Sequence, residues 1–247
     1  EVSLNAFWIQ KRDFQWSTRF TFNKLYEEIT DLETVPWTYD AFWRRPGERM
    51  GQMYGVNFVK SADELTAADL PEGYNPDAFQ KNDEGYYVPV GVGNSWEDGI
   101  SQQLWGTDVD VDGDGTGDLP WGMPVEYDDK FTKIGDVNPD FTLNFNSRLR
   151  YKNLSVFLQF VSQVGGSIYN ATRQYMYRDR MHQDLDQSGK AESEKKPIAY
   201  YTSLYHGNDR NSEFVEDGSY LKLAEASVRY RFGELALNNF AGGVLGN

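Results

Sequence analysis

The stretch from Ile134 to Tyr151 reads IGDVNPDFTLNFNSRLRY and decides the fold class of this chain. From Phe141 onward, apolar Phe141, Leu143, Phe145, Leu149 and Tyr151 alternate with polar Thr142, Asn144, Asn146, Arg148 and Arg150. Because successive side chains of a strand point to opposite faces, this pattern predicts a strand with one apolar and one very polar face. Arginine and asparagine do not suit a packed soluble core, but they suit a strand with water on one side and lipid on the other.

The same alternation recurs in three regions of the chain, 2–23, 141–162 and 220–232. Aromatic residues make up 15% of the sequence and gather at the ends of these runs, as they do in the interfacial girdles of outer-membrane barrels. A soluble β-sandwich with polar outer faces also alternates, so the pattern alone leaves both folds open.

The connections between these regions differ greatly in length. Two are short, 9–13 and 152–153, whereas 24–140 and 163–219 are long and polar. Structureless loops of that length are unusual in a compact soluble domain, whereas outer-membrane barrels combine short turns at one end with long loops at the other. The residues predict a further pair of strands near 52–59 and 86–90, and a helical piece at 170–184.

The composition excludes several classes of function. The net charge of −14, from 24 basic and 38 acidic residues, argues against a nucleic-acid partner. No cysteine is present, so neither disulfides nor thiolate metal sites can form. No apolar run is long enough for a transmembrane helix. The chain begins at Glu1 without a start methionine, and we expect it to be a mature or internal piece of a larger protein.

Five to seven strands are too few to close a large barrel, and an open edge in lipid leaves unpaired backbone groups at high cost. We therefore expect this chain either to form part of a longer polypeptide or to pair with a second chain.

Several segments, in the same order along the chain, resemble the late barrel of the SusC/RagA-type TonB-dependent transporters. They are FQWST at 14–18, MGQMYG at 50–55, the aspartate-rich run at 108–118, IGDVNPDF at 134–141, YKNL at 151–154, GGSIYN at 165–170 and VEDGSYLKL at 215–223. The plug domain, the TonB box and the early strands of that family are not found here, and 241–247 matches nothing expected of it.

The resemblance implies an all-β fold, a segment of a large antiparallel transmembrane β-barrel of about 22 strands with long extracellular loops. It also implies a multi-pass outer-membrane protein of the Bacteroidetes that imports oligosaccharides, or oligopeptides, with energy from TonB and with a SusD-like lipoprotein as partner. The expected organisation is a barrel hairpin at 1–23, an extracellular region at 24–140, a second hairpin at 141–162, an extracellular loop at 163–219, and a strand plus the start of the next at 220–247.

The aspartate-rich run is the sharpest chemical motif. Alternate carboxylates on a glycine turn converge on a hard cation, and Ca²⁺ takes six to eight oxygen ligands. One register uses Asp110, Asp112, Asp114, the Thr116 carbonyl and Asp118, with Gly115 at the turn, and the other begins at Asp108 with Gly113 at the turn. We expect a structural Ca²⁺ that stiffens the loop, with its shell completed by Glu126, Asp128 or Asp129. The alternative is a solvated acidic loop.

Aromatic residues in the long segments form a second candidate site for a ligand or partner. Either they stack on sugar rings or contact a partner, or they fill small cores of their own. The candidates are Trp37, Tyr39, Trp43, Trp96, Trp105 and Trp121.

The polar strand faces are the remaining candidate surface, and the resemblance implies that their arginines face the barrel lumen. These arginines either meet anionic groups there or pair with Glu or Asp across the strands. They are Arg19, Arg148, Arg150, Arg229 and Arg231.

Nothing in the sequence indicates an enzyme. His182 and His206 are the only histidines and are expected to be exposed loop residues, and no catalytic motif accompanies them. The alternative to an importer is a secreted, Ca²⁺-stabilised β-sandwich that binds carbohydrate.

Overall fold

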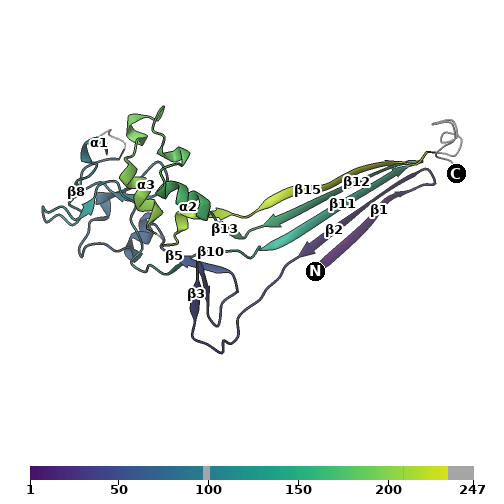
Figure 1. Ribbon diagram of the computed structural model, residues 1–247, viewed down its shortest axis with the longest axis horizontal. Coiled ribbons are helices and arrows are strands. Elements are labelled where there is room, and N and C mark those ends of the chain that lie inside the picture. The colour runs from purple at the N-terminus through teal and green to yellow at the C-terminus, as the bar shows by residue number, and fades with distance from the viewer. Residues whose placement is uncertain (97–100, 208, 233–247) are drawn as a thin grey trace. The chain divides into compact units, whose positions relative to one another are not determined.

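The computed structural model describes residues 1–96, 101–207 and 209–232, and the chain divides into two compact units. The sheet unit is formed by Glu1–Tyr26, Asn138–Gly166 and the residues from Asp217 onward, and the loop unit by Glu27–Val137 and Ser167–Glu216. Each unit is therefore assembled from segments far apart in sequence (Figure 1). The expected turn and further strand after Phe232 lie outside the described residues.

A five-stranded antiparallel sheet makes up the sheet unit (Figure 1). Its order is β1-β2-β11-β12-β15, with β1 at Val2–Gln10, β2 at Phe14–Asn23, β11 at Phe141–Tyr151, β12 at Leu154–Val164 and β15 at Tyr220–Tyr230. Short turns join β1 to β2 and β11 to β12. In the second turn, Lys152 has a φ of +50°, and its amide donates to the Asp13 carbonyl at 2.7 Å.

The register of the sheet separates an apolar face from a polar one. Phe145 lies opposite Phe20 and Phe160, and the next residue, Asn146, lies opposite Arg19 and Gln159. The apolar face is exposed in the structure, with 66% of Leu4 and 72% of Val228 accessible. A sandwich would bury this face against a second sheet, so its exposure disfavours the sandwich alternative.

The expected alternation of apolar and polar residues in β15 is interrupted by a β-bulge. Gln159 pairs with Glu225 but Phe160 pairs with Leu223, so Ala224 is the extra residue. The bulge carries Leu223 to the apolar face and Tyr220 to the polar one, the reverse of what a strict period of two predicts.

The loop unit contains short strands arranged in small sheets. A four-stranded sheet has the order β10-β5-β4-β3, and six further strands form three two-stranded pairs. The members are β3 (Trp37–Tyr39), β4 (Phe42–Arg44), β5 (Gln52–Gly55), β10 (Thr132–Asp136), the pair β6 (Phe79–Lys81) and β7 (Tyr87–Pro89), the pair β8 (Asp108–Val109) and β9 (Leu119–Pro120), and the pair β13 (Ser167–Tyr169) and β14 (Val215–Asp217).

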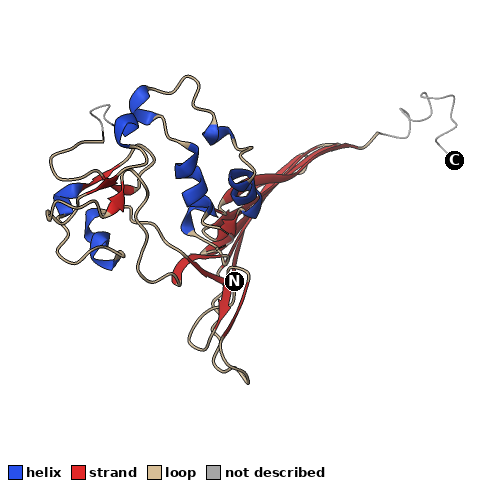
Figure 2. Ribbon diagram, turned by 60° about the vertical axis from the view of Figure 1, so that its left-hand side comes forward, coloured by secondary structure: helices blue, strands red, loops and turns tan. Residues whose placement is uncertain are grey.

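The described helices are short, and Figure 2 shows that they gather in the loop unit. They are α1 (Ser101–Leu104), α2 (Ala171–Arg178) and α3 (Ile198–Tyr205), with 3₁₀ turns η1 (Ala62–Ala67), η2 (Pro76–Ala78), η3 (Gln183–Leu185), η4 (Glu192–Glu194) and η5 (Ser212–Phe214). The chain is thus mostly β rather than all-β. The helix expected within 170–184 is present as α2, where the Asn170 side chain caps the Arg173 amide at 2.8 Å.

The strands expected near 52–59 and 86–90 form but do not pair with each other. β5 pairs with β4 and β10, and β7 pairs with β6, all within the loop unit.

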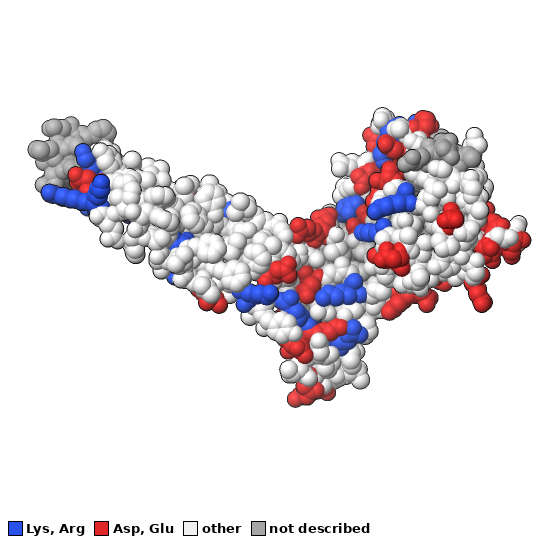
Figure 3. Space-filling model, turned by 180° about the vertical axis from the view of Figure 1, so that it is seen from behind, with Lys and Arg blue, Asp and Glu red and all other residues white. Residues whose placement is uncertain are grey.

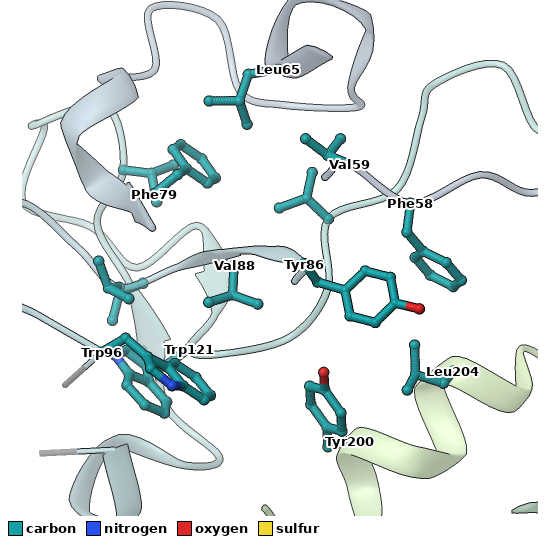
Figure 4. Packing of buried hydrophobic residues seen from close by; sticks show 14 of the residues in the cluster. Phe58, Val59, Leu65, Phe79, Tyr86, Val88, Trp96, Trp121, Tyr200 and Leu204 are labelled. Carbon is teal, nitrogen blue, oxygen red and sulfur yellow. The ribbon is translucent and has the colours of Figure 1, made fainter. Parts of the chain in front are cut away.

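The two long segments share one hydrophobic core (Figure 4). Phe58 and Trp121 come from the first segment, and Tyr177, Tyr200 and Phe214 come from the second. All five side chains are at least 98% buried. In Figure 4 the rings of Phe58 and Tyr86 lie beside Leu204 and Tyr200 of α3. The segments expected to be two separate loops therefore fold together.

A close backbone contact joins the two segments at Gly55. The Val56 amide donates to the Arg210 carbonyl at 2.8 Å, and the Ser212 amide donates to the Val56 carbonyl at 2.9 Å. A Cβ atom at Gly55 would stand 2.1 Å from the Arg210 carbonyl oxygen, so only glycine fits here.

Among the helices that the structure describes, none has the length and apolar character needed to cross a membrane.

We predict that Gly55→Ala lowers the free energy of unfolding of the loop unit by about 3 kcal/mol, because the added methyl group forces the two segments apart. Denaturant titration and limited proteolysis measure the effect, with cleavage expected in both segments. Val92→Ala, at a side chain 53% exposed, is the control and is expected to change little. Equal stability of Gly55→Ala and the unaltered protein would contradict the joint fold.

Candidate functional site

The aspartate-rich run forms the tip of the β8–β9 hairpin, in which Asp108 pairs with Pro120 and Val109 with Leu119. Val109 and Val111 are buried in the core of the loop unit and anchor the base of the loop. Oxygen atoms of Asp110, Asp112 and Asp118 lie within 4.8 Å of one another.

Backbone amides hold these carboxylates in place. Asp110 accepts hydrogen bonds from the Gly113 amide at 2.6 Å and the Gly115 amide at 2.8 Å, and these bonds lower the pKa of its carboxyl group. Asp118 accepts from the Val111 amide at 3.0 Å. Gly113 and Gly115 have φ values of +89° and +86°, which favour glycine.

This geometry favours the register that begins at Asp110. Asp108 lies in the strand pair, outside the carboxylate group. Asp112 and Asp114 accept from amides two residues ahead, those of Asp114 and Thr116. The carboxylate oxygens match the hard ligands that Ca²⁺ prefers, and three carboxylates supply part of its shell. Glu126, expected to complete the shell, is instead engaged by Lys130 at 2.7 Å and His206 at 3.1 Å.

Half of the candidate aromatic residues pack inside the loop unit. Trp96 stacks on Trp121 with ring centroids 5.0 Å apart, and Trp105 meets Trp121 edge-on at 5.0 Å. Trp96 is 3% exposed and Trp121 0%, so these rings fill a core and offer no face to a ligand.

The other aromatic candidates lie on or beside the β3–β4 hairpin. Trp37 is 42% exposed and Tyr39 69%. The Arg44 guanidinium lies 4.3 Å from the Trp37 ring, and Trp43 contacts Tyr54 edge-on at 5.2 Å. Trp37 and Tyr39 are the candidates that remain accessible to a partner.

The strand register places four of the candidate arginines on the polar face of the five-stranded sheet. Arg148 lies opposite Ser17, Arg150 opposite both Gln15 and Ser155, and Arg229 opposite Ser155. Arg19 shares this face, and Arg231 follows the end of β15. Within the residues that the structure describes, no ion pair joins any of these five side chains to a carboxylate, so the expected cross-strand pairing is not found. Arg148 instead lies 5.5 Å from the ring of Phe157.

The histidines are not the exposed loop residues that the sequence predicts. The imidazole of His182 stacks on Tyr177 with centroids 5.0 Å apart. His206 is the C-cap of α3 and has a left-handed backbone conformation, with a φ of +52°. Its Nε2 lies 3.1 Å from a carboxylate oxygen of Glu126. The hydrogen bond that the imidazole donates to the Glu126 carboxylate raises the pKa of His206.

Sequence reasoning missed the polar contacts that join the two long segments. Lys196 has a fully buried side chain whose Nζ lies 2.7 Å from Asp83. Tyr200 donates to Glu84 at 2.9 Å, and the Tyr86 hydroxyl donates to the Glu213 carboxylate. The partners are too far apart in sequence for any local spacing to reveal them.

Comparisons with known proteins agree on one family of relatives. The chain is 29% identical over 236 residues to TonB-dependent receptor P3 of Formosa agariphila, covering 95% of this chain and 21% of that protein. No family model matches the chain. The resemblance to TonB-dependent transporters expected from the sequence is confirmed.

Solved structures agree on the fold. The open-open state of the RagAB peptide importer gives a TM-score of 0.51 at 14% identity, covering 96% of this chain and 22% of that one. A second structure of the RagAB peptide transporter gives 0.51 at 16% identity, covering 98% and 23%. The chain thus spans about a fifth of the length of the relatives that it matches.

We predict that the His206–Glu126 pair makes the loop unit less stable as the pH rises. Because the pKa of His206 is raised in the folded state, its contribution is complete below about 6.5 and is lost as the pH rises through the folded pKa. The loss is expected to be no more than about 1 kcal/mol, because the pair is partly exposed and screened.

Thermal unfolding of His206→Asn from pH 5 to pH 9 measures this dependence, since asparagine tolerates the left-handed backbone but does not titrate. Glu126→Gln should flatten the same profile. A pH profile unchanged in both variants would show that the pair contributes nothing.

Proposed function

We propose that this chain forms part of the transmembrane barrel and surface loops of a TonB-dependent importer in the bacterial outer membrane. The observation that carries the proposal is the five-stranded sheet, whose one face is apolar and exposed and whose other face carries arginines. Strands of 9–11 residues with this alternation fit the thickness of a bilayer. The relatives named above support the same class of protein.

We infer that the loop unit is the extracellular part. Both of its segments leave the sheet from the end opposite the short turns, and outer-membrane barrels place their long loops outside the cell. In this arrangement the arginine-bearing face looks into the lumen, where water or a plug domain meets it.

The cargo is proposed to be an oligosaccharide, with an oligopeptide as the alternative within the same class, and the partner a SusD-like lipoprotein. The two solved structures with a similar fold are both of RagAB, described as a peptide importer in one and as a peptide transporter in the other, which supports the alternative. Trp37 and Tyr39 of β3 are proposed to contact such a lipoprotein, which their exposure supports.

The proposal predicts that the intact protein fractionates with the outer membrane and leaves it only in detergent. Proteinase K added to whole cells is expected to cut within 27–137 or 167–216 and to spare the short turns. Growth of a deletion strain on defined oligosaccharides or oligopeptides as the sole carbon source then separates the two cargo classes. A soluble protein of about the 28.4 kDa of this chain would overturn the proposal and support the secreted sandwich.

We also propose that the aspartate-rich loop binds a structural Ca²⁺. The gathering of Asp110, Asp112 and Asp118 within 4.8 Å supports this, because like charges at such separations repel without a counter-ion. The ion would stiffen the hairpin tip and take no part in chemistry.

Calorimetric titration with Ca²⁺ is expected to detect binding that falls at least roughly tenfold when Asp112→Ala and Asp118→Ala are combined, since two carboxylates of the group are lost. EDTA should increase proteolysis within 108–118 and leave the strands intact. Asp108→Asn is the matched control because this residue lies outside the carboxylate group. Equal affinity of the double variant and the unaltered protein would remove the metal site.

A further inference from the structure

The end of the five-stranded sheet that carries the short turns is strongly basic, although the whole chain has a net charge of −14. Four basic residues lie in or beside the turns, and Asp13 is the one acidic residue among them in the described part of the chain. The four are Lys11, Arg12, Lys152 and Arg231, all exposed. Figure 3 shows basic side chains gathered at this end of the strands. At the opposite end, Asp140 precedes β11 and Asp217 precedes β15.

Aromatic rings line the apolar face just inside this basic end. Trp8 and Trp16 lie with ring centroids 5.8 Å apart, and Phe14 meets Tyr151 edge-on at 6.3 Å. The Trp8 indole donates to the Thr18 hydroxyl at 2.9 Å, and the Trp16 indole donates to Ser147 at 3.1 Å. The indole N–H groups are thus satisfied by the sheet itself, and the rings present apolar surface outward.

Cations and rings meet directly at this level. The Lys152 Nζ lies 5.5 Å from the centroid of the Tyr151 ring. A depression with a volume of about 460 Å³ is lined by Gln10, Lys11, Arg12, Gln15 and Trp16, which combine basic, amide and aromatic groups.

We propose that the short-turn end of the sheet is a binding site for anionic phospholipid. The phosphate-bearing headgroup would lie in the depression against Lys11 and Arg12, and Lys152 would contact a neighbouring headgroup. The acyl chains would follow the apolar face past Trp16. Aromatic rings at headgroup depth next to basic side chains form the arrangement that favours acidic lipids.

A lipid fits this end better than an acidic protein segment does. The indole N–H groups of the outward rings already donate to residues of the sheet, so they offer no hydrogen bond to a protein partner. A bilayer, in contrast, requires apolar surface and cations at adjacent depths. The inference rests on the proposed membrane location of the sheet unit.

The test uses the intact protein reconstituted into bilayers that contain brominated phosphatidylglycerol or brominated phosphatidylcholine. Bromine quenches the fluorescence of tryptophans that touch the lipid, which reports on Trp8 and Trp16. We expect several-fold stronger association with phosphatidylglycerol. Combining Lys11→Gln, Arg12→Gln and Lys152→Asn should abolish the preference for phosphatidylglycerol, since each basic side chain near an anionic surface strengthens binding to that surface roughly fivefold. Asparagine is chosen for the left-handed backbone of Lys152.

Two control variants make the result specific. Lys24→Gln, Lys60→Gln and Lys81→Gln together remove the same charge from exposed residues elsewhere, and this variant should keep the preference. Lys11→Arg with Arg12→Lys keeps the charge and should keep it too. Loss of the preference in the first control would mean that the total charge of the protein is responsible. Loss in the second would mean that the shape of one side chain is responsible. Either result would overturn the site.

The remaining outcomes separate this inference from the proposed function. Equal quenching by both lipids in the unaltered protein would overturn the site and leave the membrane location standing. No quenching by either lipid would mean that the apolar face does not meet acyl chains, and the membrane proposal would fail together with the inference. Soluble polyglutamate could also displace phosphatidylglycerol from the unaltered protein and have no effect on the variant that lacks the three basic side chains. That result would assign Lys11, Arg12 and Lys152 to an acidic protein partner and overturn the lipid site.

Discussion

The register of β11 is the constraint on which the rest of the structure depends. This strand pairs with β2 on one edge and β12 on the other, so it joins residues 14–23 to a hairpin more than a hundred positions later. Since all neighbours are antiparallel, β2 ends, β11 begins, β12 ends and β15 begins at one end of the sheet. The two long segments therefore start and finish side by side, and a shared core becomes possible without any long crossing of the chain.

The sheet was readable from sequence because its determinants are local. Alternation within a single strand predicts both the strand and its two faces, and β11 obeys the rule at each of its 11 residues except Ser147, a polar residue on the apolar face. The bulge at Ala224 broke the rule because an extra residue shifts the pairing without leaving a pattern in composition. Phe157 of β12 pairs with Arg148 on the polar face, and the Arg148 guanidinium lies 5.5 Å from its ring.

The loop unit was far less predictable, and the reason is the distance between partners. The aspartate hairpin closes over about ten residues, so its turn glycines and the grouping of Asp110 and Asp112 follow from local sequence. Asp83 and Lys196 are 113 residues apart, and neither stands in a periodic run. Scattered aromatic residues looked equally suited to a ligand or a core, and only the joint fold assigned Trp96 and Trp121 to the core.

Because the two long segments share one core, they can be exchanged between related proteins only together. The Tyr200 hydroxyl of the second segment donates to Glu84 of the first. The Val56 amide donates to the Arg210 carbonyl, and the two backbones approach so closely here that Gly55 cannot be replaced by a larger residue. A segment transplanted alone from a relative would meet a partner surface shaped for a different chain. Inheritance and engineering alike must therefore treat 27–137 and 167–216 as one exchangeable module, although two strands and a turn separate them along the chain.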